Sequence, residues 1–486
     1  MNYSVIRKIL GKIMITIGLL MSISLIFCII YKENLINYIS FIVPVTLLIS
    51  IGSFMNIKQA KSNKIGAREG FIIVGITWFI IALFGCLPFI ITKEIPNFFD
   101  AFFETVSGFT TTGASVCTDV ENLSHSIQFW RSFTHWIGGM GVLVFVLAFI
   151  PESKDGSAVH MLRAESPGPQ VGRLVSRMQA SSRILYLIYI GMTLIEFLLL
   201  WLGPDEKMTM FNSLIYSIGT AGTGGFAIHS TSLEFFAPYT QYVVAIFMLL
   251  FGINFSLYYL LLIGNVKEVF KNEELKWYLS IVVISVTLIT INIFTTFNNL
   301  ELSFRQALFQ VASILSTTGY SSVNYDLWPS LSKTIIVVLM FFGAMAGSTA
   351  GGTKISRINL LTKSSVKKIK NMMSPRKVEV VTLDGKPVSP STLDGVQSYF
   401  IIYMIVLLTC ALLISVDNFD ISTNITASLS CISNIGPGIG DVGPYGSFAG
   451  FSYFSKFILS IEMIAGRLEL FPILVLFSPK TWKKYI

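Results

Sequence analysis

The chain has 486 residues, of which 53% are hydrophobic and 13% are charged, and its formal net charge is +8. Soluble proteins carry roughly 25% charged residues, so this composition excludes an ordinary soluble domain and predicts a polytopic membrane protein. The basic residues gather in alternate connections between apolar runs, such as those with Lys58 and Arg68 or Lys363 and Lys370. This placement argues against a nucleic-acid surface, and the positive-inside rule puts both termini in the cytoplasm. Five cysteines and four histidines show no metal-ligand spacing, so we expect no structural metal and no cofactor in the chain.

The predicted elements begin with two apolar runs, at about 10–31 and 36–56, that form a transmembrane helix pair within residues 1–60. A unit of span, short half-helix, glycine-containing turn and second span then occurs four times. We assign these repeats to 61–155, 156–270 with a preceding cytoplasmic segment, 271–372 with an intramembrane loop, and 396–486. A cytoplasmic hairpin linker is predicted at 373–395, where apolar residues alternate around Asp384 and Gly385. The predicted fold class is all-α integral membrane, with four helix–pore-helix–helix repeats around a central pore and an extra N-terminal helix pair.

The half-helices are predicted at 98–109, 210–218, 304–315 and 423–433. About 12 residues rise by roughly 18 Å, which is near half the hydrocarbon thickness, so the chain must turn within the membrane and return. Non-helical backbone survives at that depth only where it is buried in protein or lines a watery path. Each half-helix also directs its partial negative C-terminal end at the turn, which favours a cation there.

The turns themselves supply the candidate ion-binding groups, and we treat all four residues of each as site residues. Glycine permits backbone conformations that bring carbonyl oxygens toward a common axis, where they can replace the hydration shell of a cation. No Asp or Glu lies within the turns, which favours a monovalent ion over a divalent one. The candidate residues are Thr110, Thr111, Thr112 and Gly113; Gly222, Thr223, Gly224 and Gly225; Ser316, Thr317, Thr318 and Gly319; and Ser433, Asn434, Ile435 and Gly436.

A run of small residues interrupts the apolar segment that starts at Ile335, and helix propensity falls sharply across it. We predict an irregular loop that can obstruct the cytoplasmic half of the path, although close helix packing through small residues is the alternative. The order Gly352-Thr353-Lys354 is the reverse of a phosphate-binding loop, and no strand precedes it. The candidate gating residues in and beside this run are Gly343, Gly347, Ser348, Thr349, Gly351, Gly352 and Lys354.

Arg467 is the remaining candidate gating residue, because it lies inside the last predicted span. A charge within the membrane is expensive and is usually functional or paired. We predict that Arg467 hydrogen-bonds to carbonyl groups of the interrupted run and adds a positive barrier to passing cations. A static ion pair with Glu462 or Glu469 is the alternative.

Five short motifs resemble the Trk/Ktr potassium-uptake superfamily: residues 130–132, 136–141, 163–169, 347–352 and 466–469. The N-terminal helix pair and the run Ala164 to Pro169 are more similar to the TrkH/TrkG type of transmembrane subunit than to KtrB. The resemblance covers nearly the whole chain. The second turn departs from the family pattern, because it has glycine where related turns often have serine or another polar residue, and this predicts looser ion selection there.

The resemblance implies a homodimeric subunit in a bacterial-type cell (inner) membrane, with a cytoplasmic nucleotide-binding regulatory ring of the TrkA type as its partner. It also implies K⁺ as the transported ion. The residues at which we expect K⁺ are the second and third of each turn: Thr111, Thr112, Thr223, Gly224, Thr317, Thr318, Asn434 and Ile435.

The sequence therefore predicts potassium-selective uptake through a gated, channel-like pore of a Trk-type system, and no enzymatic activity. Potassium symport coupled to H⁺ or Na⁺ is an alternative, but it requires a proton carrier or a second ion site. A polytopic membrane enzyme is more remote, because no acidic or histidine-containing catalytic cluster stands out. Acidic residues near the outer mouth, among them Glu104 and Glu121, either attract cations or are simply hydrated.

Overall fold

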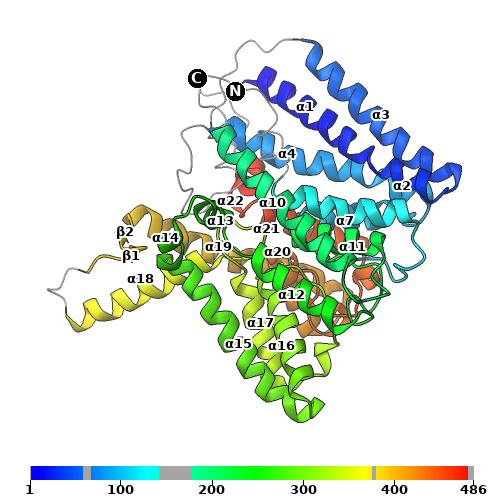
Figure 1. The fold of residues 1–486 in the computed structure, drawn as a ribbon. Coiled ribbons are helices and arrows are strands. Elements are labelled where there is room, and N and C mark those ends of the chain that lie inside the picture. The colour runs from blue at the N-terminus through cyan, green and yellow to red at the C-terminus, as the bar shows by residue number, and fades with distance from the viewer. Residues whose placement is uncertain (1, 59–66, 142–177, 375–378, 480–486) are drawn as a thin grey trace.

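The computed structural model describes residues 2–58, 67–141, 178–374 and 379–479, and these residues form an array of packed helices (Figure 1). Six helices in these ranges are long and apolar enough to cross a membrane, and a bent helix pair gives a seventh span if it is counted as one. The all-α membrane fold that the sequence predicts is thus confirmed. The motif at 163–169 and the basic residues at 480–484 lie outside the described residues.

The N-terminal pair consists of α1 (Tyr3–Met21), α2 (Ser24–Ile30) and α3 (Leu35–Ile57), at the blue end of the chain in Figure 1. Glycines let α1 and α3 approach closely, because a Cβ on Gly52 would lie only 2.6 Å from the carbonyl oxygen of Gly11. Glu33, between α2 and α3, accepts a 3.0 Å hydrogen bond from the amide of Ser126 at the start of α7 (His125–Gly139). This hydrogen bond attaches the N-terminal helix pair to the first repeat at the connection between α2 and α3.

Each repeat opens with a long helix and continues with a half-helix. The long helices are α4 (Ala67–Gly85) with its extension α5 (Leu87–Thr92), α10 (Met178–Trp201), α15 (Glu273–Phe297) and α19 (Pro390–Ile414). The half-helices are α6 (Phe98–Phe109), α11 (Met210–Gly222), α16 (Leu300–Leu315) and α20 (Ile421–Ser433). Each half-helix begins after a capping residue whose side chain accepts a hydrogen bond from a backbone amide of the first turn: Asn97, Thr209, Asn299 and Asp420. The predicted start of α16 at 304 was wrong, because Asn299 caps that helix one turn earlier.

The second helices of the repeats are shorter than the sequence predicts. They are α7, α12 (Pro238–Phe251), α17 (Ser330–Phe342) and α21 (Tyr453–Arg467), with 13 to 15 residues each. Helices of that length reach about 20–22 Å, less than the roughly 30 Å of hydrocarbon. After α12 the chain bends by 92° into α13 (Phe255–Leu262), and after α21 a short break leads to α22 (Phe471–Phe477). We predicted such a break only after α17.

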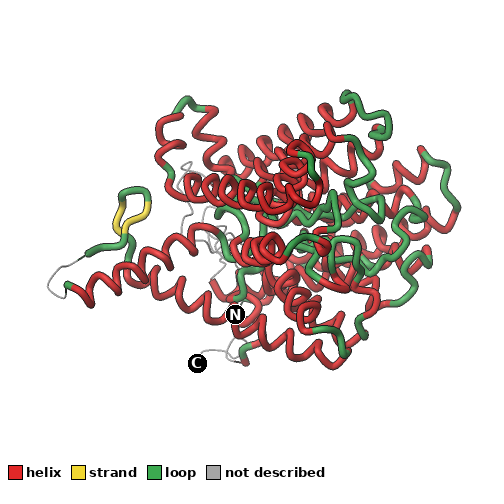
Figure 2. The backbone as a smooth tube through the Cα atoms, turned by 90° about the horizontal axis from the view of Figure 1, so that it is seen from below, coloured by secondary structure: helices red, strands yellow, loops and turns green. Residues whose placement is uncertain are grey.

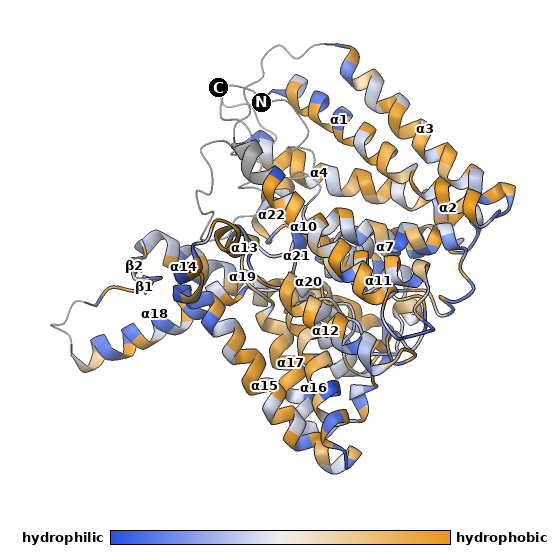
Figure 3. Cartoon of the chain, in the orientation of Figure 1, coloured by the Kyte–Doolittle hydropathy of each residue, from blue (hydrophilic) through white to orange (hydrophobic). Residues whose placement is uncertain are grey.

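Short elements that the sequence predicts to be cytoplasmic follow the second and third repeats. They are α14 (Val266–Lys271), α18 (Ile355–Met373) and a hairpin of β1 (Thr382–Leu383) and β2 (Lys386–Pro387), which pair antiparallel. Figure 3 shows hydrophilic residues along α18 and mainly hydrophobic outer surfaces on α3 and α15. Asp384, in the hairpin turn, accepts a 2.7 Å hydrogen bond from the amide of Glu273 at the start of α15. The hairpin therefore docks on the third repeat, at the start of α15.

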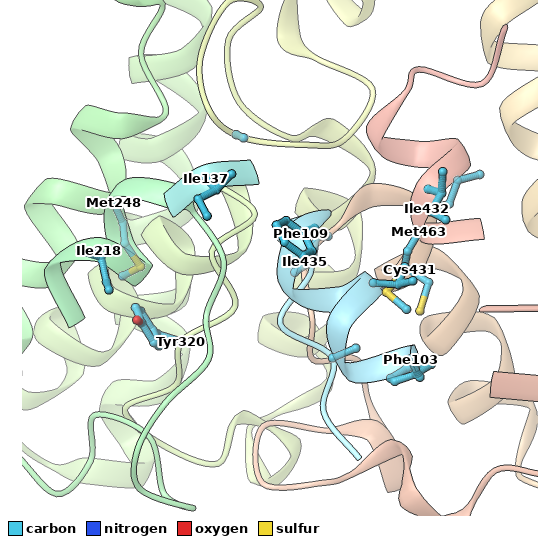
Figure 4. Packing of buried hydrophobic residues seen from close by; sticks show 14 of the residues in the cluster. Phe103, Phe109, Ile137, Ile218, Met248, Tyr320, Cys431, Ile432, Ile435 and Met463 are labelled. Atoms are coloured by element: carbon cyan, nitrogen blue, oxygen red, sulfur yellow. The ribbon is translucent and has the colours of Figure 1, made fainter. Parts of the chain in front are cut away.

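The interior of the molecule contains both apolar side chains and irregular backbone. Figure 2 shows loop segments among the helices, and 3-10 turns at 325–327, 415–417, 440–442 and 448–450 belong to such connections. Figure 4 shows buried apolar side chains from different repeats, including Phe109 of α6, Ile218 of α11 and Met463 of α21. One core thus joins the repeats.

Candidate functional site

Turn 1 (110–113), turn 2 (222–225), turn 3 (316–319) and turn 4 (433–436) share one backbone conformation. The second residue of each is left-handed, with φ of 57° at Thr111, 52° at Thr223, 56° at Thr317 and 55° at Asn434. The fourth residue is a glycine whose φ is 78°, 83°, 84° and 105° in turns 1 to 4. The left-handed conformation costs a non-glycine residue about 1–2 kcal/mol and is least favourable for a β-branched side chain. Its occurrence at three threonines indicates a constrained site.

The amide groups of the turns are engaged by the half-helices. The amide of the third residue donates to the carbonyl five residues earlier in each case, from Thr112 to Ser107 at 2.9 Å, for example, and from Gly224 to Gly219 at 3.0 Å. Turns 3 and 4 repeat this bond at 2.9 Å. This pattern is a Schellman cap, which satisfies the carbonyls at the end of a helix. The cap is formed by N–H groups of the turn, and the carbonyl groups of the turn do not take part in it.

The four turns close into a ring. A Cβ on Gly113 would overlap the carbonyl oxygen of Gly224, and one on Gly225 would overlap that of Thr318. A Cβ on Gly319 would overlap the carbonyl oxygen of Ile435, and one on Gly436 would lie 2.6 Å from that of Thr112. The fourth glycine of each turn therefore contacts the third carbonyl of the next turn, in the order 1, 2, 3, 4 and back to 1.

Eight carbonyl oxygens of this ring have no hydrogen-bond partner among the described residues. They belong to the second and third residues of the turns, all of which are buried. Buried backbone carbonyls are almost always paired, so eight unpaired oxygens in one ring call for a ligand. Neutral, polarised oxygens suit a weakly hydrated cation, and the donor set therefore fits a monovalent ion.

Side chains support the turns in two different ways. In turn 1 the hydroxyls of Thr110 and Thr112 are 2.8 Å apart, and in turn 3 those of Ser316 and Thr318 are 2.7 Å apart. In turn 2 the imidazole of His135 replaces such a bridge. A Cβ on Gly224 would overlap this ring, and the Nε2 atom accepts a 3.2 Å hydrogen bond from the amide of Phe226. The glycine that departs from the family pattern is therefore required by the histidine behind it.

Glu104 and Arg131 form a buried ion pair behind turn 1. Arg131 Nη2 lies 2.7 Å from Glu104 Oε1, and the guanidinium also stacks over the ring of Phe226, 4.3 Å from its centroid. The suggestion that Glu104 lies in a hydrated outer mouth was wrong, because its side chain is fully buried. Glu121 does lie outside, where hydrogen bonds from the amide and hydroxyl of Ser230 hold the pKa of its carboxyl below the usual value.

The inner loop (residues 343–354) is irregular, as predicted, and it contacts the underside of the ring. The amide of Gly351 donates a 2.7 Å hydrogen bond to the hydroxyl of Thr317, and a Cβ on Gly351 would overlap the carbonyl oxygen of Ser433. Gly347 accepts a 3.1 Å hydrogen bond from the amide of Phe255, just past the bend between α12 and α13. The loop therefore lies against turns 3 and 4 and against the bend of the second repeat.

The other predicted gating residues shape the loop itself. Gly343 and Gly352 lie face to face, because a Cβ on Gly343 would come within 2.9 Å of the Cα of Gly352. Ser348 donates a 2.7 Å hydrogen bond to the carbonyl of Met345, and buried Lys354 donates to the carbonyl of Ala350. These contacts lie within the loop and hold its ends together.

Arg467, the last residue of α21, joins three parts of the site. Its Nη1 atom donates to the carbonyl of Thr349 in the inner loop at 2.8 Å and to the hydroxyl of Thr111 in turn 1 at 3.2 Å. Its Nη2 atom donates to the carbonyls of Gly138 and Gly139 at the end of α7, the latter at 2.6 Å. The predicted contact between Arg467 and a loop carbonyl is thus present.

The glutamates considered as alternative partners of Arg467 have other contacts. Glu469 pairs with Arg357, and Glu462 accepts a 2.6 Å hydrogen bond from the hydroxyl of Ser428.

The sequence analysis missed Glu274 and His135 as structural residues of the site. One oxygen of buried Glu274 accepts hydrogen bonds from the amides of Ala346 in the inner loop, at 2.7 Å, and of Ser356 just after the loop in α18, at 3.0 Å, and so fastens the loop to α15. A carboxylate at the start of an apolar span was a usable signal for Glu274. His135 was considered only as a metal ligand, although a polar residue in a helix among tryptophans and glycines also indicates a buried contact.

Comparisons with known proteins agree with this architecture. The model of the family described as TrkH, cation transport protein, matches residues 39–484. The chain is 32% identical to the Trk system potassium uptake protein TrkH of Escherichia coli strain K12 over the full length of both chains. It is 31% identical to TrkG of the same strain over 93% of each chain.

A solved structure and the names of the relatives also indicate a transport protein. The crystal structure of the potassium transporter TrkH from Vibrio parahaemolyticus superposes with a TM-score of 0.88 at 28% identity, covering 99% of this chain and all of that one. These relatives are named for transport, in agreement with the prediction that the chain is not an enzyme. The chain therefore belongs to the TrkH family of cation transport proteins.

Proposed function

We propose that the chain mediates potassium-selective uptake across a bacterial cell (inner) membrane through a gated, channel-like pore, as part of a Trk-type system. The observation that carries this proposal is the closed ring of eight buried, unpaired carbonyl oxygens. A cation that loses its water at the ring regains oxygen ligands from all four repeats. The names of the relatives, which are potassium uptake proteins, support potassium as that cation.

The proposed selectivity filter consists of the four turns, and the proposed gate consists of the inner loop with Arg467. Gly351 lies directly against turns 3 and 4, so the loop obstructs the cytoplasmic side of the ring in the conformation described here. Arg467 holds the loop by the carbonyl of Thr349 and places a positive charge beside turn 1. Displacement of the loop, with Arg467 released from it, opens the path.

The partners belong to this proposal as well. A second copy of the chain and a cytoplasmic TrkA-type ring are the expected assembly. The cytoplasmic surface available to such a ring includes α18 and the hairpin around Asp384. The hairpin contacts Glu273 of α15, and the next residue of the same helix, Glu274, holds the inner loop, so a partner on the hairpin would be linked to the proposed gate through adjacent residues.

Symport with H⁺ is the second candidate, and one residue favours it. Glu196 of α10 is fully buried near the hydroxyl of Thr220, and neither oxygen of its carboxyl accepts a hydrogen bond of normal geometry among the described residues. A carboxyl of this kind within the membrane can carry a proton.

The deciding experiment measures ion flux in liposomes that contain only the purified chain. Under the proposal, K⁺ and Rb⁺ flow down their gradient without added H⁺ gradient, Na⁺ or nucleotide, and the reversal potential follows the K⁺ gradient alone. A reversal potential that shifts with the pH gradient, and loses that shift in Glu196→Gln, supports symport. No K⁺ flux from correctly folded protein contradicts both.

A further inference from the structure

The second residues of the four turns have one backbone conformation but differ in the partners of their side chains. The hydroxyl of Thr317 accepts a hydrogen bond from the amide of Gly351 in the inner loop, at 2.7 Å. The hydroxyl of Thr111 accepts one from Arg467, at 3.2 Å, and Arg467 in turn holds the loop at Thr349. In turns 1 and 3, the second side chain is thus tied to the gate.

Among the described residues, no hydrogen bond joins the second side chain of turn 2 or turn 4 to the inner loop or to Arg467. The hydroxyl of Thr223 donates to the carbonyl of its own neighbour Gly222 at 2.7 Å. The amide group of Asn434 donates to the carbonyl of Met463 at 2.9 Å and to the hydroxyl of Thr112 at 3.0 Å. The partners in these bonds lie in turn 2, in turn 1 and in α21, and none of them is a residue of the inner loop.

The two tied turns lie opposite each other in the ring, since the glycine contacts run from turn 1 through turns 2, 3 and 4 back to turn 1. Turns 1 and 3 are also the pair in which hydroxyls of the first and third residues bridge. The side-chain contacts of the ring therefore repeat in opposite turns and not in all four turns. The hydrogen bonds from Gly351 to Thr317 and from Arg467 to Thr111 follow the same two-fold pattern.

We propose that Thr111 and Thr317 are positioning residues that couple the gate to the filter, so that the inner loop is released only together with a change at two opposite turns. This inference rests on the proposed function. Both hydroxyls are buried, so withdrawal of the loop leaves Thr317 without its donor, and a movement of Arg467 together with the loop leaves Thr111 without its own. The strained left-handed backbone at these threonines then loses a contact that holds it, and the spacing of the carbonyls in turns 1 and 3 changes.

The test compares Thr317→Val with Thr223→Val in the liposome flux assay. Both variants lose one hydroxyl at a left-handed threonine of the ring, but only Thr317 contacts the inner loop. Loss of one hydrogen bond is worth about 1 kcal/mol, which corresponds to about a fivefold change in an equilibrium. We therefore expect basal K⁺ flux in Thr317→Val to exceed that in Thr223→Val about fivefold, with Thr317→Ser returning it toward the wild-type value.

The K⁺ to Na⁺ flux ratio is the second readout, because a purely structural role of Thr317 in the loop would not change it. Coupling predicts a lower ratio in Thr317→Val than in Thr223→Val. Equal flux and equal ratios in the two variants overturn the coupling, whereas absence of K⁺ flux from the wild type overturns the proposed function instead. If Thr317→Val does not fold, Thr111→Val decides the question by the same comparison.

Discussion

At the scale of single residues, the close packing of the site requires glycine at some positions, because a Cβ there would collide with a neighbouring group. Gly224 has no Cβ because the imidazole of His135 fills that space, and the same ring accepts a hydrogen bond from the amide of Phe226. Glycine in turn 2 therefore allows tight support of the turn, which argues against the looser ion selection that the sequence suggested. The fixed imidazole takes over the role of a bridging hydroxyl.

Gly224→Ala should lower the free energy of unfolding by about 1–3 kcal/mol, because the new methyl overlaps the ring of His135. His135→Ala removes the overlap, so the double variant should be less destabilised than the two single effects combined. Chemical denaturation in detergent measures all three. Gly395→Ala is the control, since a Cβ there meets nothing within 4 Å and α19 should gain helix propensity. Additive effects in the double variant would contradict the contact.

At the scale of elements, the sequence predicted the half-helices and turns but not the early ends of the second helices. Short apolar runs that stop at glycine identify a half-helix, because its length excludes a full crossing. The end of α7 and the breaks after α12 and α21 have weaker signals, such as Gly139, Gly252 and Gly466, and glycine is also common in continuous membrane helices. Only the dense run of small residues after α17 was distinctive. The hydrogen bonds of the inner loop depend on distant residues, so local sequence could not give them.

The contacts of Arg467 allow two contributions to the proposed gate to be tested separately, its positive charge and its hydrogen bonds to the inner loop. Arg467→Ala removes both and should raise basal K⁺ flux about tenfold or more, because hydrogen bonds to a charged group are worth roughly 1.5–3 kcal/mol. Arg467→Lys keeps the charge, but one ammonium cannot reach the carbonyls of Thr349 and Gly139 together as the guanidinium does. We expect intermediate flux in Arg467→Lys, measured in liposomes at equal protein content. Wild-type flux in both variants, with normal folding, would show that Arg467 does not hold the gate.

At the scale of the whole molecule, the ring is the place where the two ends of the repeat array meet. Gly436 of the last repeat contacts the carbonyl of Thr112 in the first, and the amide of Phe448 donates a 2.9 Å hydrogen bond to the carbonyl of Ser115 nearby. The eight unpaired oxygens also repel one another across the ring. Under the proposed function, a cation bound by these oxygens stabilises the closed arrangement, so ion binding is linked to folding.

This linkage predicts that K⁺ and Rb⁺ raise the thermal unfolding midpoint more than Na⁺ or choline at the same ionic strength. A ligand at 100 times its dissociation constant stabilises a fold by about 2.7 kcal/mol, and equal ionic strength removes the difference in screening. Gly436→Ala should abolish the K⁺-specific increase, because φ of 105° and the nearby oxygen of Thr112 both oppose a Cβ. Gly191→Ala, where a Cβ meets nothing within 4 Å, should retain the increase. Equal midpoints in all four cations would mean that the ring does not bind K⁺ selectively, because a filter that prefers K⁺ must be stabilised by it.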